Sequence, residues 1–212
     1  MDTTSTTTVK RVNVRKMTMT AMLSAIAFIL MFLDFSVPVM PAFIKMDLSE
    51  LPALVGTFAM GPVSGVVICL IKNLLHLFMT DTAGVGELSN FLLGAAFVLP
   101  AGLIYKKWKG KKSAFIGALL GALLMALISI VSNQFIVYPA YYVMYSLPEK
   151  GVLAMYQALP EAIPVLPHVD SILEALVKYN APFTFVKGLF SVLITLVIYK
   201  PISPFLKGSY KK

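Results

Sequence analysis

Residues 113–138 read SAFIGALLGALLMALISIVSNQFIVY and contain no charged side chain. A helix needs about 20 consecutive apolar residues to cross the hydrocarbon core of a bilayer, and this stretch is long enough to do so. The basic run KKWKGKK, residues 106–112, comes directly before it. Because Lys and Arg collect in cytoplasmic loops, the pattern predicts a transmembrane helix that begins at the cytoplasmic surface.

The composition of the whole chain extends this prediction. Of the 212 residues, 58% are hydrophobic and 13% are charged, and the mean hydropathy is +0.82. A soluble domain typically has about a quarter of its residues charged. We therefore expect an all-α membrane protein with six transmembrane helices, of which the second is short. The expected spans are residues 17–35, 51–60, 63–79, 87–105, 113–138 and 181–199.

Basic residues set the expected orientation. When the N-terminus is placed in the cytoplasm, thirteen of the eighteen Lys and Arg fall in three cytoplasmic segments, namely residues 1–16, 106–112 and 200–212. This enrichment predicts that the N- and C-termini are both cytoplasmic and that residues 17–199, between them in the sequence, form the membrane domain. It also accounts for the net charge of +8 without a nucleic-acid partner. Residues 139–180 are then expected outside, as a loop with short interfacial helices.

Polar side chains gather near the outer ends of the expected helices. A charged residue at mid-membrane costs about 2.5–3.5 kcal/mol on insertion scales, so such residues are candidates for function. Amines, amides and a few carboxylates among many aromatic residues are typical of a site for a small organic molecule with a flat ring. The polar residues concerned are Lys72, Asn73, His76, Glu87, Asn90, Asn133, Gln134, Thr184 and Lys187.

Catalytic and metal sites find little support in the sequence. It has no G-x-S-x-G, H-E-x-x-H or G-x-x-x-x-G-K-[ST] motif. Its histidines are His76 and His168, and Cys69 is its only cysteine, so no Cys/His cluster has the spacing of a metal site. We expect no resident metal or cofactor, and no hydrolysis of ATP by this chain itself.

Four blocks of the sequence resemble a known family. They are KMDLSELPAL (45–54), IKNLLH (71–76), GVGELSNF (84–91) and PFTFVKG (182–188). From about Met17 to Tyr199 the chain resembles the riboflavin-specific substrate-binding (S) components, of the RibU type, of energy-coupling factor (ECF) transporters. The resemblance implies a six-helix protein of the bacterial cell membrane that binds its vitamin near the outer surface. It further implies work with a transmembrane coupling subunit and two cytoplasmic ATPases, and no enzyme activity.

The resemblance also implies the roles of particular residues. In this family the ligand is held by the first outer loop, which is the polar loop Asp34 to Glu50 in this sequence, and by the outer ends of the last three helices. The small residues Ala21 and Ala25 of the first helix are expected to contact the coupling subunit, since such residues let helices approach closely. The expected riboflavin-binding residues are Lys45, Met46, Asp47, Leu48, Glu87, Asn90, Asn133, Thr184 and Lys187.

Three other functions remain open at this point. The chain could be an S component for another vitamin, or a membrane scaffold without a ligand. It could also be an intramembrane enzyme that uses Lys72, His76 and Glu87.

Overall fold

The computed structural model describes residues 13–80 and 82–207. Most of the predicted N-terminal tail, residues 1–12, and the end of the predicted C-terminal tail, residues 208–212, lie outside this part of the chain. The described elements are α1 (Val14–Met31), β1 (Phe35–Ser36), β2 (Lys45–Met46), α2 (Glu50–Met60), α3 (Pro62–His76), η1 (Leu77–Met79), α4 (Val85–Lys107), α5 (Lys111–Ser132), η2 (Asn133–Val137), α6 (Tyr138–Met144), α7 (Glu149–Ala162), α8 (Ile172–Ala175), η3 (Leu176–Asn180) and α9 (Ala181–Lys207).

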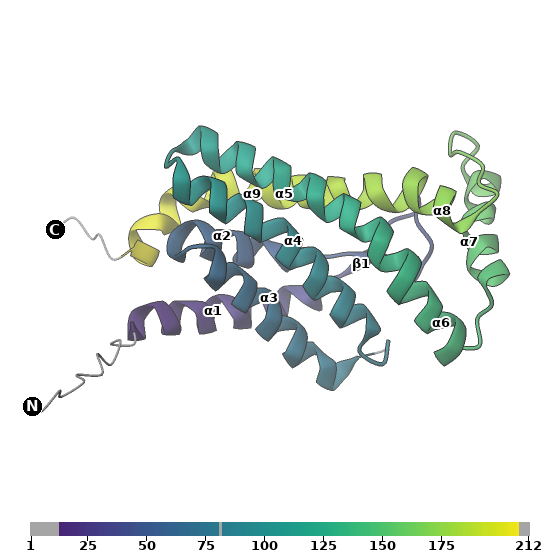
Figure 1. The fold of residues 1–212 in the computed structure, drawn as a ribbon, viewed down its shortest axis with the longest axis horizontal. Coiled ribbons are helices and arrows are strands. Elements are labelled where there is room, and N and C mark those ends of the chain that lie inside the picture. The colour runs from purple at the N-terminus through teal and green to yellow at the C-terminus, as the bar shows by residue number, and fades with distance from the viewer. Residues whose placement is uncertain (1–12, 81, 208–212) are drawn as a thin grey trace, which may run out of the picture.

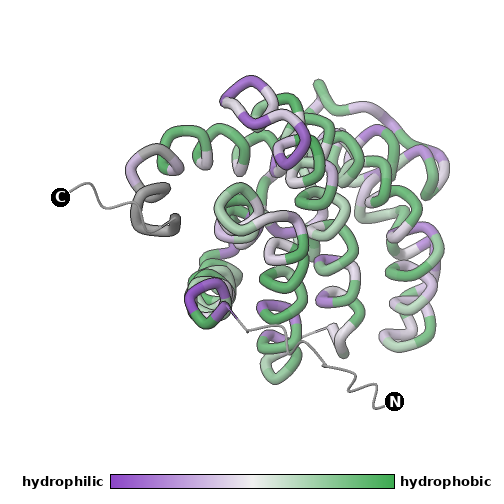
Figure 2. The backbone as a smooth tube through the Cα atoms, turned by 60° about the vertical axis from the view of Figure 1, so that its left-hand side comes forward, coloured by the Kyte–Doolittle hydropathy of each residue, from purple (hydrophilic) through white to green (hydrophobic). Residues whose placement is uncertain are grey.

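The long helices pack side by side in a bundle (Figure 1). Hydrophobic residues colour most of their length (Figure 2), as expected of helices that face lipid. α2 is apolar but has only 11 residues, which agrees with the predicted short second helix. The all-α membrane class is therefore as predicted, whereas a sixth crossing stays a prediction. Among the described residues, five segments are long and apolar enough to cross a membrane, namely Val14–Met31, Pro62–Met79, Val85–Lys107, Lys111–Met144 and Ile172–Tyr199.

The segment after α1 forms a hairpin that the sequence did not predict. Phe35 pairs with Met46 and Ser36 with Lys45, in antiparallel register. An ion pair of 2.9 Å between the Asp34 carboxylate and the Lys45 ammonium group closes the hairpin beside these pairs. Because this pairing needs extended backbone, α1 ends at Met31, before the predicted end at residue 35.

The helices next to the predicted outer loop, residues 139–180, are longer than expected. α5 continues through the π-helical segment η2 into α6, and α8 leads through the π-helical segment η3 into α9. Only the middle of this loop is separate from the long helices, and it contains α7. At its other end, α9 runs to Lys207, past the predicted end at residue 199. Single π-helical turns within α-helices are frequent at functional sites.

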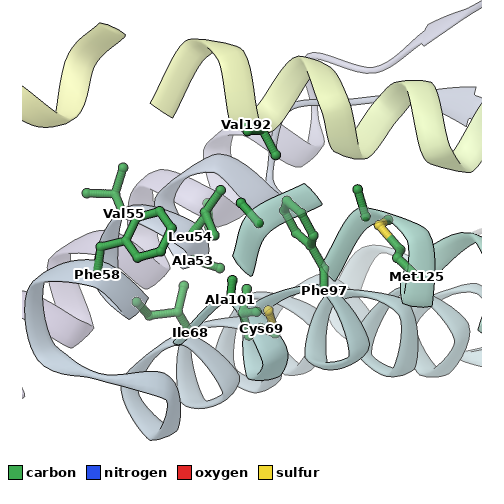
Figure 3. Packing of buried hydrophobic residues seen from close by; sticks show 14 of the residues in the cluster. Ala53, Leu54, Val55, Phe58, Ile68, Cys69, Phe97, Ala101, Met125 and Val192 are labelled. Carbon is green, nitrogen blue, oxygen red and sulfur yellow. The ribbon is translucent and has the colours of Figure 1, made fainter. Parts of the chain in front are cut away.

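Small residues allow the helices of the bundle to approach closely. A Cβ atom added at Gly117 of α5 would lie 3.0 Å from the carbonyl oxygen of Ala101 in α4. One added at Gly188 of α9 would lie 2.8 Å from the Cβ of Ala122. Figure 3 shows larger side chains, such as Leu54 and Phe97, packed between the helices. This part of the bundle is therefore a packed core.

The two ends of the bundle differ in what they contain. α1 begins and α9 finishes at the same end, where the basic turn between α4 and α5 also lies (Figure 1). The opposite end is formed by the hairpin, α6, α7 and α8 (Figure 1). The polar residues singled out from the sequence lie toward this second end.

Candidate ligand-binding site

A cavity of about 640 Å³ lies at the end of the bundle that carries the hairpin and α6. Ligand sites of proteins are commonly about 300–1,000 Å³, with mostly apolar walls and a few placed polar groups. The cavity fits this description. Its aromatic lining consists of Phe43, Tyr138, Tyr141, Tyr145 and Phe183, and its polar or charged lining of Asp34, Lys45, Asp47, His76, Thr82, Glu87, Ser89, Asn90, Asn133, Asn180, Thr184 and Lys187.

A buried ion pair joins the first outer loop to α9 in one wall of the cavity. The Lys187 ammonium group lies 2.8 Å from Oδ2 of Asp47. The other Asp47 oxygen, Oδ1, accepts a hydrogen bond of 2.8 Å from the backbone N–H of Ser49. Burial alone would raise the pKa of the Asp47 carboxyl, but the Lys187 and Lys72 ammonium groups outweigh it and hold that pKa well below its usual range. Asp47 is therefore a carboxylate at neutral pH.

A second pair of charged residues lies directly behind the first. Lys72 of α3 and Glu50 of α2 are fully buried, and the Lys72 ammonium group lies 2.9 Å from Oε1 of Glu50. Lys72 also donates a hydrogen bond to the Ser49 hydroxyl. Oε2 of Glu50 lies 3.4 Å from the Lys187 ammonium group. Two carboxylates and two ammonium groups thus balance one another where an unpaired charge would be costly.

The Glu87 carboxylate is held in a fixed orientation in another part of the wall. Its Oε1 lies 2.7 Å from Nδ1 of His76, which comes from the end of α3. Its Oε2 accepts hydrogen bonds of 2.8 Å from the Thr80 hydroxyl and 3.0 Å from the Thr82 hydroxyl. The short segment between α3 and α4 therefore positions a carboxylate at the start of α4.

A closed set of hydrogen bonds joins α7 to the first residue of α6 and to the last residue of the π-helical segment η3. The Tyr156 hydroxyl donates to Oδ1 of Asn180 (2.5 Å), and Nδ2 of Asn180 donates to the Tyr138 hydroxyl (3.1 Å). The two tyrosine oxygens lie 2.5 Å apart. The Phe43 ring of the first outer loop packs edge-on against both tyrosine rings. This set fixes Tyr138 and Asn180, which line the cavity.

The structure brings most of the predicted binding residues to one cavity. Two of them do not line it, because Met46 packs into the protein with 8% exposure and Leu48 is half-buried next to α2. The predicted residues that do line it are Lys45, Asp47, Glu87, Asn90, Asn133, Thr184 and Lys187. Their role in binding stays a prediction.

Sequence reasoning missed Glu50, and it missed the hydrogen bonds that tie Tyr138 to Tyr156 and Asn180. Asn180 had a signal, since it is an amide directly before an apolar span. Glu50 had a weaker one, because its position in the loop before the short second helix did not mark it as buried. Its burial follows from its contacts with Lys72 and Lys187, which lie far away in the sequence.

The residues considered for an intramembrane enzyme do not form one group. His76 and Glu87 contact each other and line the cavity, whereas Lys72 is bound to Glu50 and Ser49 and does not line it. Across residues 13–80 and 82–207, no three His, Cys, Asp or Glu side chains are arranged to hold a metal ion.

Ala21 and Ala25 are exposed on the same face of α1. The neighbouring Met22, Ile26 and Ile29 are also exposed, with 42%, 43% and 60% of their surface accessible. Leu23 and Ala27 on the other face are buried in the core. The predicted docking pair thus lies on a surface that no other described part of the chain covers.

Comparisons with known proteins agree with the fold. The chain is 30% identical to the riboflavin transporter RibU of Staphylococcus aureus over 88% of its length and 89% of the relative's. It is 29% identical to the riboflavin transporter FmnP of Bacillus subtilis, over 92% and 95% of the two chains. A solved structure described as the S component of a bacterial ECF transporter matches with a TM-score of 0.71 and 30% identity, over 92% of this chain and 99% of that one.

These relatives are transport components and not enzymes, which sets the enzyme hypothesis aside. A family model described as "ECF transporter, substrate-specific component" matches residues 15–202. This chain therefore belongs to the family of substrate-specific components of ECF transporters.

Proposed function

We propose that this chain is the riboflavin-binding subunit of an ECF transporter in a bacterial plasma membrane. It takes up riboflavin from the outer side and works with a transmembrane coupling subunit and two ATPases that supply the energy. The observation that carries the proposal is the cavity of about 640 Å³, with aromatic walls and fixed polar groups. The names of relatives at about 30% identity support riboflavin as the ligand.

The charge distribution supports binding at the outer side. The basic turn between α4 and α5 and the start of α1, with Arg15 and Lys16, lie at the end of the bundle opposite the cavity. Lys and Arg collect on the cytoplasmic side of membrane proteins. The end that carries the cavity then faces outward.

The lining groups suit the chemistry of riboflavin. Its flat ring system can stack on aromatic side chains such as Tyr141 and Phe183. The polar edge of the ring needs hydrogen-bond donors and acceptors. The amide of Asn133 provides a donor and an acceptor, and the ammonium group of Lys187 provides donors. The ribityl hydroxyls can donate to a carboxylate such as Glu87.

Purification of the full chain in detergent tests the ligand directly. Protein from riboflavin-grown cells should be yellow, and ligand-free protein should quench the fluorescence of added riboflavin to a one-to-one end point. A colourless protein that leaves riboflavin fluorescence unchanged would refute the proposal. Binding of a different vitamin in the same titration would assign the cavity to that ligand instead.

Asn133→Ala should weaken riboflavin binding by about tenfold or more, because a polar group left without its hydrogen-bond partner in a desolvated site costs about 1–3 kcal/mol. Asn133 lines the cavity at the start of η2, whereas its neighbour Gln134 does not. Gln134→Ala is therefore the matched control, and its affinity should stay within about twofold of the unsubstituted chain. Equal affinities for all three proteins, measured by fluorescence titration, would exclude Asn133 from the site.

A further inference from the structure

Four charged groups in and behind the cavity wall form two tiers. Asp47 and Lys187 form the front tier and line the cavity. Glu50 and Lys72 form the rear tier, with no exposed surface and no place in the lining. A ligand in the cavity would therefore touch the front tier alone.

Glu50 is the link between the two tiers. Its Oε1 lies 2.9 Å from the Lys72 ammonium group, and its Oε2 lies 3.4 Å from that of Lys187. Lys187 lies closer to Asp47, at 2.8 Å. A buried carboxylate needs a cation near it, so Glu50 without Lys72 would draw Lys187 away from Asp47 and toward the rear.

Lys72 acts on the front tier by a second route. It donates a hydrogen bond to the Ser49 hydroxyl, and the backbone N–H of Ser49 donates to Oδ1 of Asp47. The Lys72 ammonium group thus fixes Ser49, which holds Asp47. It also neutralises Glu50, which competes with Asp47 for Lys187. Both effects reach the cavity through other residues.

We propose that Lys72 is a positioning residue for ligand binding, which neutralises Glu50 and so keeps the Lys187 ammonium group at the cavity wall. The inference rests on the proposed function, because its measured quantity is riboflavin affinity. If Lys72 were purely structural, Lys72→Met would lower the stability of the protein, and its effect on affinity would be the same whether or not Lys187 is present. The two roles therefore differ in how the substitutions combine.

The central experiment compares Lys72→Met with the double variant Lys72→Met/Glu50→Gln. Lys72→Met should weaken riboflavin binding by about tenfold or more, since a hydrogen-bonded charge at the cavity wall is displaced. The double variant removes both rear charges together, so Lys187 is no longer drawn to the rear and binding should be at least about threefold tighter than in Lys72→Met, although short of full recovery because the Ser49 hydrogen bond is still lost. Affinities are measured by fluorescence titration on monodisperse protein, and Thr195→Val, a buried polar change on α9 away from the cavity, is the control.

The Lys187→Met background separates positioning from scaffolding. If Lys72 acts mainly through Lys187, then Lys72→Met should weaken binding by less than about threefold once Lys187 is absent, and the loss that remains reflects the route through Ser49. A full tenfold loss in that background would overturn the proposal, as would an unchanged affinity of Lys72→Met in the otherwise unsubstituted chain.

Two further outcomes are informative. Should Lys72→Met fail to fold, the charge-balanced double variant decides, because a folded double variant that binds no better than Lys187→Met would overturn the proposal. If the unsubstituted chain binds no riboflavin, the proposed function fails and this inference fails with it. Riboflavin binding that Lys72→Met leaves intact would overturn this inference alone.

Discussion

Lys187→Met should weaken riboflavin binding by about 100-fold or more, since truncating one partner of a buried, hydrogen-bonded charge pair typically costs about 2–5 kcal/mol. The Lys187 ammonium group contacts Asp47 and Glu50 and lines the cavity. Its removal leaves two buried carboxylates with one cation, Lys72, and removes a donor from the wall. Fluorescence titration of the purified variant measures the effect.

The matched control is Lys178→Met, which removes a lysine from the same end of the bundle. Lys178 pairs with Glu174 at the surface, where its side chain is 38% exposed, and it does not line the cavity. Its substitution should change affinity by less than about twofold, because exposed ion pairs contribute about 0–1 kcal/mol. A Lys187→Met variant that binds as tightly as this control would remove Lys187 from the binding site.

The sequence predicts the helices of this protein better than its loops. Hydropathy locates the spans because each one must be apolar over about 20 residues, whatever it packs against. α1 ends early because residues 35–46 form a hairpin, which depends on pairing and not on local composition. The π-helical segments also escape prediction, since they extend ordinary helices by backbone geometry alone.

The first outer loop shows why the predicted site is partly displaced. The resemblance assigns four consecutive residues to ligand binding, but Lys45 and Asp47 line the cavity while Met46 and Leu48 do not. Lys45 and Met46 form a strand, in which successive side chains point to opposite sides, so Lys45 lines the cavity and Met46 is buried on the other side. Family motifs identify the segment, and the backbone conformation decides which of its side chains face the cavity.

The partners of the charged residues require the folded structure. Lys72, Asp47 and Lys187 are conspicuous in the sequence because charge is rare near apolar spans. Asp47 and Lys187, however, are 140 residues apart, and no local pattern connects them. Glu50 is the residue whose burial ties them together, and only the packing of α2 against α3 and α9 brings it there.

Ala21→Trp should reduce riboflavin uptake by at least about tenfold in cells that contain the partner subunits, while riboflavin affinity stays unchanged. Ala21 is exposed on α1, and Met31, ten residues later, is the part of this helix that reaches the cavity. Ten residues correspond to about 15 Å along a helix, so the new side chain lies away from the ligand. A helix that docks through small residues does not tolerate a bulky one, because close approach is lost.

Val197→Trp provides the matched control for this change. Val197 is 75% exposed on α9, so a tryptophan there also faces outward. It lies on a different helix from Ala21 and Ala25. Uptake should persist in this variant if docking is confined to α1. Normal uptake with Ala21→Trp would mean that the coupling subunit binds elsewhere, and lost affinity would mean that the substitution reaches the cavity. Loss of uptake with retained affinity in Ala21→Trp alone separates docking from binding, because Ala21 lies on the exposed face of α1 and does not line the cavity.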